Sequence, residues 1–220
     1  MENQKLTGLF HGYAGDCLVI SVMAHYFDKT SIYKKMEAAI RKENEHFNKL
    51  RGNWQDTREG MKNDNDMSAI SYGAVGIVFS RLCIYLKKET PDLIKKMCWE
   101  DINLGIKKLV SQSREEYSDD TLINGYSGSL IVLKMIQDTK IIKDDSLNRK
   151  IDALIQEGKK ILTGQTWRYP KFTYIFNPAF FNGRMGTTFV LWYISQEQNM
   201  SFDLLNFINA KELIDDSADI

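Results

Sequence analysis

The sequence predicts an all-α protein, a partial α/α toroid of about four helical hairpins whose inner helices begin at GxxG motifs. Three observations predict this fold class. A GxxG motif occurs four times along the 220 residues, an apolar run follows each motif, and amphipathic charged segments separate the runs. The chain has only three prolines, which leaves room for long uninterrupted helices. A chain of this length can form one domain, and we assign residues 1–220 to it.

The four GxxG motifs are spaced like the units of a repeat protein. They read HGYAG, YGAVG, NGYSG and NGRMG, and their first glycines are Gly12, Gly73, Gly125 and Gly183. These glycines are 61, 52 and 58 residues apart, which leaves room for two helices and two loops in each unit. Each unit is therefore predicted to be a helical hairpin.

The segments between the motifs are of two kinds. The runs that follow the motifs carry little charge and read CLVISVMAHYF, IVFSRLCIYL, SLIVLKMI and TTFVLWYIS. A helix that is apolar on almost all sides is buried, so these runs are expected to form inner helices. The segments IYKKMEAAIRKENEHF, DLIKKMCWEDINLGIKKLV and LNRKIDALIQEGKKIL repeat apolar residues at spacings of three and four, which predicts outer helices. Periodicity alone does not distinguish a closed toroid from an open α-solenoid.

Two longer connections, residues 50–68 and 164–179, are candidates for functional loops. The second contains five aromatic residues together with Arg168 and Lys171, and its stretch KFTYIF alternates like a strand. A short strand pair and an aromatic lid are equal candidates for this stretch. Stacking on nucleic-acid bases is the weaker alternative, because a single basic aromatic stretch in a neutral protein is little evidence for it.

The composition limits the possible partners and locations. Basic and acidic residues number 29 each, so we expect no nucleic acid as a partner and no attraction to an anionic membrane. Cys17, Cys83 and Cys98 lack CxxC spacing, which is typical of buried thiols in a reducing compartment. The polar first seven residues do not resemble a signal peptide, and no apolar run reaches the roughly 18 residues of a transmembrane segment. The expected location is cytoplasmic.

The glycines themselves call for an explanation, because a glycine inside a helix costs about 1 kcal/mol relative to alanine. One explanation is packing, since a residue without a Cβ lets a helix enter a crowded centre. The other is electrostatic. Converging helix N-termini present N–H groups and positive potential, which would favour an anion such as a thiolate or an enolate oxyanion. Both explanations stay open at this level.

The motifs, taken in this order, resemble those of the LanC-like lanthionine synthetase cyclases. The stretches INGYSGSLIVLKMI and FFNGRMGTTFVLWYISQEQNMSFDLLNFI carry the similarity most clearly. The resemblance covers nearly all of this chain but corresponds to the later part of the family's length. It implies an α/α toroid that matures ribosomally made peptides, by adding cysteine thiols to dehydroalanine or dehydrobutyrine to form thioether rings.

The resemblance also implies that the zinc site of the family has been lost. In the family, a cysteine of a WCxGxPG-like motif and a Cys-His pair of a CHGxxG motif hold a zinc ion, which converts the substrate thiol to the thiolate. The corresponding stretches here read AISYGAVG and LINGYSG, and the three ligand positions are Ser71, Ile123 and Asn124. Serine and asparagine bind zinc poorly and isoleucine does not bind it. We therefore expect no metal and no other cofactor.

Two residues match positions that the resemblance associates with the chemistry. His11, in FHGYAG, matches a family histidine proposed to act in proton transfer, and Tyr72 matches an aromatic residue beside the zinc site. A histidine that merely caps or packs is the alternative for His11. Candidates for substrate binding are Tyr13, Ser71, Asn124, Tyr126 and Arg184. The two tyrosines could instead pack at helix interfaces, and Arg184 could hold a peptide carboxylate or be solvated.

Three functions are compatible with these residues. The chain is a zinc-independent lanthionine cyclase with His11 as general base, a non-catalytic pseudoenzyme that binds a precursor peptide or a synthetase subunit such as a dehydratase, or a helical scaffold unrelated to cyclases. About four hairpins are present where the family ring has seven. An open array would expose apolar inner helices, so we expect a homo-oligomer or a partner that supplies further hairpins.

Overall fold

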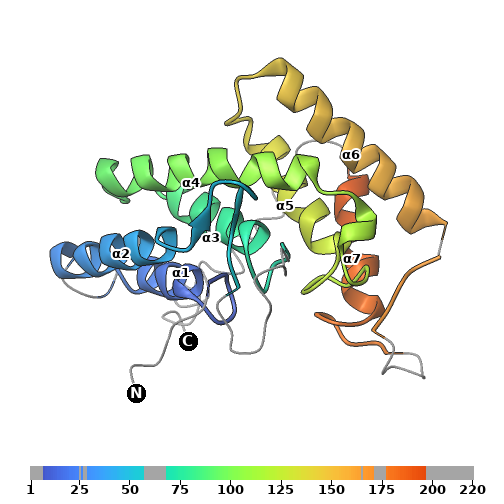
Figure 1. The fold of residues 1–220 in the computed structure, drawn as a ribbon, viewed down its shortest axis with the longest axis horizontal. Helices are drawn as coiled ribbons and strands as arrows, with labels where there is room; N and C mark the ends of the chain where they lie inside the picture. The colour runs from blue at the N-terminus through green and yellow to red at the C-terminus, as the bar shows by residue number, and fades with distance from the viewer. Residues whose placement is uncertain are drawn as a thin grey trace, which may run out of the picture.

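The computed structural model describes residues 7–24, 26, 29–56, 68–164, 166–170 and 177–196. These ranges contain helices at every predicted inner and outer position and one small hairpin that was not predicted (Figure 1). The helices are α1 (Tyr13–Met23), α2 (Lys29–Asn44), α3 (Ala74–Leu86), α4 (Asp92–Ser111), α5 (Tyr126–Thr139), α6 (Asp145–Thr163) and α7 (Arg184–Ser195), with a 3₁₀ turn η1 (Arg114–Glu116). Strands β1 (Phe47–Asn48) and β2 (Asn53–Trp54) pair in antiparallel register, Phe47 opposite Trp54.

The helices form two layers. The inner helices α1, α3, α5 and α7 contact one another in chain order, and α2, α4 and α6 cover α1, α3 and α5 from outside (Figure 1). The described residues thus contain three complete hairpins and the inner helix of a fourth. This confirms the predicted all-α fold, a partial α/α toroid.

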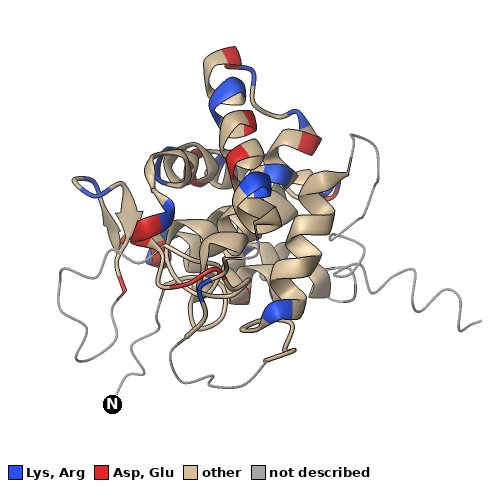
Figure 2. Cartoon of the chain, turned by 90° about the vertical axis from the view of Figure 1, so that its right-hand side faces the viewer, with Lys and Arg blue, Asp and Glu red and all other residues tan. Residues whose placement is uncertain are grey.

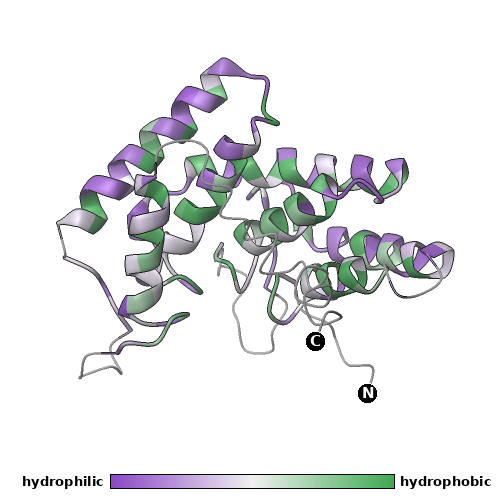
Figure 3. Cartoon of the chain, turned by 180° about the vertical axis from the view of Figure 1, so that it is seen from behind, coloured by the Kyte–Doolittle hydropathy of each residue, from purple (hydrophilic) through white to green (hydrophobic). Residues whose placement is uncertain are grey.

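Burial separates the two layers as the sequence predicts. In α3, all residues from Ala74 to Ile84 are buried, whereas α6 buries only Ile151, Ile155, Gly158 and Leu162, along one stripe. Figure 3 shows the same contrast, with hydrophilic residues along the outer face of α6 and hydrophobic residues on the inner helices. The amphipathic pattern therefore places each outer helix with its stripe on the inner layer.

In two hairpins, a glycine of the outer helix lies directly against a side chain of the inner helix. A Cβ on Gly105 of α4 would lie 2.3 Å from the side chain of Val78, and one on Gly158 of α6 would lie 2.4 Å from Leu130. Val78 and Leu130 occupy the same place in their motifs, five residues after the first glycine. Both hairpins therefore close through the same contact.

The second glycine of each motif is required by a close backbone contact. In every motif, the carbonyl oxygen of the residue six positions earlier lies 1.8 to 2.4 Å from the point where a Cβ would stand. A contact below 3.0 Å leaves no room for any side chain. These glycines are Gly15, Gly76, Gly128 and Gly186. The packing explanation for the repeated glycines is sufficient at these four positions.

A buried ion network joins the first two hairpins. Arg81 of α3 is fully buried and donates hydrogen bonds to Glu43 of α2 and Asp101 of α4, both at 2.8 Å. Asn44 bridges the network to the hairpin, because it donates to Asp101 and accepts from the indole N–H of Trp54. Arg81 lies inside the apolar run that forms α3, so its charge is buried together with that helix.

The charged residues and the thiols lie in different parts of the fold. Basic and acidic residues are interspersed along the described helices (Figure 2). Cys17, Cys83 and Cys98 are buried thiols, as predicted. None of the helices in the described ranges is long and apolar enough to cross a membrane.

Candidate functional site

The second and third motifs meet through the three residues that the resemblance places at ligand positions, Ser71, Ile123 and Asn124. The hydroxyl of Ser71 donates a hydrogen bond to the amide oxygen of Asn124, and the backbone N–H of Ser71 donates to the carbonyl of Ile123 at 3.1 Å. Residues 53 positions apart are therefore neighbours at the starts of α3 and α5. Proximity of these three positions is what a shared site requires.

The first and fourth motifs join the same region. The backbone N–H of Ile123 donates to the carbonyl of Phe181 at 3.0 Å, and the ring of Phe181 packs edge-on against Phe10 with centroids 5.9 Å apart. The rings of His11 and Tyr72 are stacked, with centroids 5.5 Å apart and planes at 18°. The amino ends of the four inner helices are thus gathered in one place.

The donor atoms gathered there do not fit a zinc ion. Ser71 contributes a hydroxyl and Asn124 an amide oxygen, and these two atoms already bind each other. Zinc sites in proteins use thiolate, imidazole and carboxylate ligands. Across the described ranges, no group of three His, Cys, Asp or Glu residues is arranged to hold a metal.

Internal acceptors occupy part of the helix starts, which limits the predicted anion site. The carboxylate of Glu43 accepts hydrogen bonds from the N–H groups of Gly8 and Ala14, at 3.0 and 3.1 Å. The side chain of Asn53 accepts from the N–H of Ala74 at 2.9 Å. At α1 the protein therefore supplies its own anion to the helix N-terminus, and at α3 it supplies an amide.

His11 lies at the surface, beside a small groove. The groove has a volume of about 320 Å³, and Phe10, His11, Asp16 and Val19 are among its lining residues. His11 is exposed, and Tyr72 is half-buried beneath its ring. An imidazole that is held by stacking on one face and open to solvent can exchange a proton with a bound substrate.

The other candidate residues are more dispersed. Tyr126 is 5% exposed and packs against Tyr117, and burial raises its pKa to about 12. Its environment is that of a core residue and not that of a residue lining an opening. Tyr13 packs against a buried apolar cluster to which α1, α2, α3 and α4 contribute. Arg184 begins α7 and lies over the ring of Tyr169, 5.6 Å from its centroid. The alternating stretch KFTYIF lies outside the described residues.

One ion cluster near the site was not found by the sequence analysis. The buried carboxylate of Asp120 accepts hydrogen bonds from the side chains of Arg114 and Arg168 and from the backbone N–H of Arg168. Although burial alone would raise the pKa of Asp120, these hydrogen bonds lower it below its usual range. The spacing of these residues in the sequence does not predict this cluster, because Arg114 and Asp120 lie between α4 and α5 whereas Arg168 follows α6. It fixes the segment that carries Trp167 and Tyr169.

The comparisons with known proteins bear on this arrangement. Residues 1–97 match the family model described as Lanthionine synthetase C-like protein. The resemblance to the LanC-like family is confirmed. That match includes the first two GxxG motifs and with them His11, Ser71 and Tyr72. No curated protein matches the sequence.

The fold comparison covers the remaining motifs as well. The structure is similar to that of a protein named nisin cyclase, with a TM-score of 0.61 and 19% sequence identity. The similarity covers 94% of this chain and 52% of nisin cyclase, so the chain spans about half the length of that protein. The shared feature is the α/α toroid architecture.

Proposed function

We propose that this LanC-like chain acts in the maturation of a ribosomally made peptide and handles a dehydrated, cysteine-containing precursor without a zinc ion at the family position. The observation that carries the proposal is the contact between Ser71 and Asn124 at the meeting point of the four motifs. The resemblance assigns zinc ligands to these positions, and their side chains here bind each other. The substrate surface of a cyclase is therefore proposed to persist around a centre with different chemistry.

The reaction that this proposal assigns to the chain is the addition of a thiol to a dehydroamino acid. The cysteine sulfur forms a bond to the β-carbon of dehydroalanine or dehydrobutyrine, and the double-bond electrons move to the adjacent carbonyl to give an enolate. The thiol proton leaves to the imidazole of His11, and a proton is then returned to the α-carbon. No oxidant or further reactant is needed. Tyr72 holds the ring of His11 from one face.

The alternative is a pseudoenzyme that binds the precursor peptide or a synthetase subunit such as a dehydratase. Two observations favour it. A hydroxyl and an amide do not activate a thiol as a zinc ion does. Among the described residues, the first and last inner helices also present exposed apolar side chains, Val19 on α1 and Met185 on α7, each more than half exposed. A partner or a second copy of the chain would cover such residues.

Incubation with a dehydrated precursor peptide distinguishes the two. Loss of alkylatable thiol without a change in peptide mass, unaffected by a chelator, is expected for a zinc-independent cyclase. Binding of the peptide without thiol loss would identify the pseudoenzyme. If the peptide neither binds nor loses its thiol, the proposal is wrong and the chain is a helical scaffold of another kind.

A further inference from the structure

A continuous aromatic strip runs from the first motif to the far end of α7. Phe10 packs on Phe181, Phe181 on Phe180, Phe180 on Phe189 and Phe189 on Trp192, with ring centroids 5.4 to 5.9 Å apart. Four of the five side chains are exposed, between 37% and 52%, and Phe189 is half-buried. Exposed aromatic residues scattered singly are ordinary, but a connected row of this length is typical of a binding surface.

The strip begins at the candidate site. Phe10 precedes His11 directly, and the carbonyl of Phe181 holds the backbone of Ile123 beside Asn124. A ligand that lies along the strip would therefore have one part next to His11 and the motif contacts. The strip and the candidate site form one surface.

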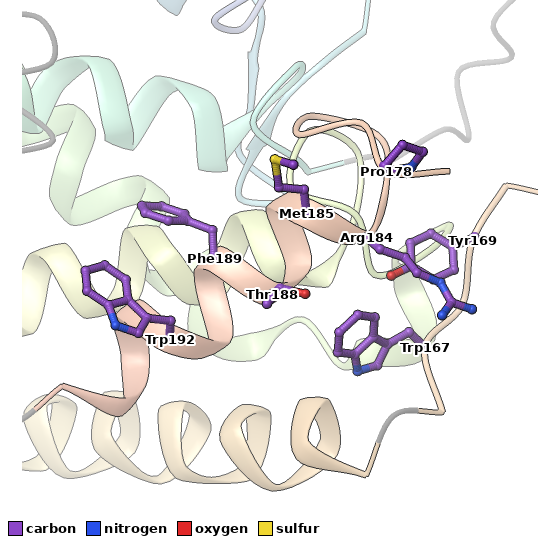
Figure 4. Close-up of a pocket in the computed structure, with 8 residues that line it drawn as sticks. All are labelled: Trp167, Tyr169, Pro178, Arg184, Met185, Thr188, Phe189 and Trp192. Carbon is purple, nitrogen blue, oxygen red and sulfur yellow. The ribbon is translucent and has the colours of Figure 1, made fainter. Parts of the chain in front are cut away.

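The strip ends in a groove along α7. The groove has a volume of about 740 Å³, and most of the side chains that line it are apolar or aromatic (Figure 4). Its lining residues come from α7 and from the segments on either side of the stretch KFTYIF, and they are Trp167, Tyr169, Pro178, Arg184, Met185, Thr188, Phe189 and Trp192. Volumes of this size hold several amino-acid side chains.

Arg184 makes the two ends of the groove chemically different. It is the charged residue among the eight that line the groove, and it lies over the Tyr169 ring at the end where α7 begins (Figure 4). Phe189 and Trp192 lie further along the helix (Figure 4). From Arg184 to Trp192 the helix rises about 12 Å, which is the length of about four residues of extended peptide.

We propose that the aromatic strip and this groove bind an extended segment of the precursor peptide, about four residues long, with apolar side chains along α7 and a carboxylate at Arg184. This inference rests on the proposed function, because it takes a peptide as the substrate. Apolar side chains on the ligand remove the exposed rings from water. The carboxylate pairs with a guanidinium that the Tyr169 ring already orients, and the lining residues contain no acidic side chain to repel it.

Short fluorescein-labelled peptides test the proposal with the full chain. The probes are acetylated Phe-Ile-Leu-Glu amide and its Gln counterpart, and fluorescence anisotropy measures their affinity. Neither contains cysteine, so their binding does not depend on ring formation. We expect the Glu peptide to bind about fivefold more tightly than the Gln peptide, as for a partly exposed ion pair. Equal binding of the two peptides would remove the assigned role of Arg184.

Two variants with matched controls locate the binding. Arg184→Gln is expected to abolish the preference for Glu, whereas Arg41→Gln, at an exposed arginine of α2, keeps it. Trp192→Ser is expected to weaken both peptides about tenfold, as for an aromatic anchor of an interface, whereas Leu50→Ser, at a fully exposed apolar residue of the β1–β2 turn, changes neither. Circular dichroism confirms that each variant is folded.

Two outcomes would overturn the proposal. One is an unchanged affinity in Trp192→Ser. The other is absence of peptide binding together with a fall in mass of Trp192→Ser by light scattering, which would show that a second copy of the chain occupies the groove. The cyclisation assay distinguishes this inference from the proposed cyclase activity. Binding of the short peptides without ring formation in the precursor would support the peptide groove and contradict the cyclase activity. Ring formation without binding of the short peptides would support the cyclase activity and contradict the peptide groove.

Discussion

The hydroxyl of Ser71 donates a hydrogen bond to the amide oxygen of Asn124, and this contact joins the second and third GxxG motifs of the chain. The two side chains are therefore close enough to share a ligand. Substituting the residues that the resemblance assigns to the family is expected to create a metal site. The triple variant Ser71→Cys, Ile123→Cys and Asn124→His would present two thiolates and an imidazole, a ligand set that zinc favours.

The measurement is zinc content after gel filtration, by competition with a chromogenic chelator. We expect about one zinc ion for each chain of the triple variant and none for the wild type, because three protein ligands and a water complete a tetrahedral site. A folded triple variant that holds no more zinc than the wild type would show that the side chains at these positions cannot converge on one ion.

Substitution of His11 tests its proposed role as the base. His11→Ala is expected to slow ring formation by about 10² to 10⁴, the range for loss of a general acid–base group. His46→Ala is the matched control, because His46 lies just before β1 and outside the motifs. The rate of thiol loss on a dehydrated precursor is the readout. Equal rates for the wild type and His11→Ala would exclude His11 as the base.

The second glycine of the third motif is expected to tolerate no side chain. Gly128→Ala would place a Cβ 2.4 Å from the carbonyl oxygen of Leu122. Forcing extra volume into such a contact typically costs about 1 to 3 kcal/mol of unfolding free energy. Gly164→Ala is the control, because the nearest atom to its Cβ would be 3.4 Å away and its φ is −68°. Urea unfolding of both variants measures the difference, and equal midpoints would contradict the packing argument.

Removal of the Arg81 charge is expected to leave two buried carboxylates without their partner. Glu43 and Asp101 are both buried, and burial already raises the pKa of each against the effect of Arg81. Breaking a buried pair in this way costs about 3 to 5 kcal/mol, so Arg81→Met should unfold at much lower urea concentration. Adding Glu43→Gln and Asp101→Asn should recover part of the loss. Arg41→Met, at an exposed arginine, should change little.

The lowered pKa of Asp120 leads to a prediction of how the free energy of unfolding depends on pH. Its pKa is lowered in the folded chain by hydrogen bonds from Arg114 and Arg168, which outweigh the opposing effect of burial. A lowered carboxyl pKa stabilises the folded state above the unfolded value of about 3.9, and that contribution is lost as the pH falls through the folded pKa. The urea midpoint of the wild type should therefore fall more steeply below pH 5 than that of Asp120→Asn. Parallel curves would assign the acid sensitivity to other groups.

Most of the architecture could be predicted from the sequence, because the glycine motifs and the change from apolar to amphipathic runs repeat along the chain. The buried thiols also follow from the runs that contain them. The hairpin of β1 and β2 could not be predicted, since its strands are two residues long and form around Trp54, whose indole binds Asn44. A stretch of two residues is too short to show the alternation of apolar and polar residues that identifies a strand.

The site was predicted less completely than the fold. The position of Ser71 and Asn124 near each other follows from the motifs. The aromatic strip does not, because Phe10 and Phe181 are 171 positions apart and come together only when the segments before α1 and α7 meet. The N-termini of the inner helices lie close together, as the glycine motifs predict. Glu43, which lies in an outer helix and carries no motif, already pairs with the start of α1.

The contacts of the second glycine in each motif determine which residues can be substituted without disturbing the packing of the hairpins. A Cβ placed on the second glycine of each later motif would lie 3.1 Å from a side chain that precedes the motif before it, Leu9, Ile70 and Leu122 in turn. Successive hairpins therefore pack closely against one another at these glycines. None of the side chains in these contacts is a candidate catalytic or substrate-binding residue. Substitution of Ser71 or Asn124 is therefore expected to leave the packing between successive hairpins intact. Packing and reactivity depend on different residues of the same short motifs.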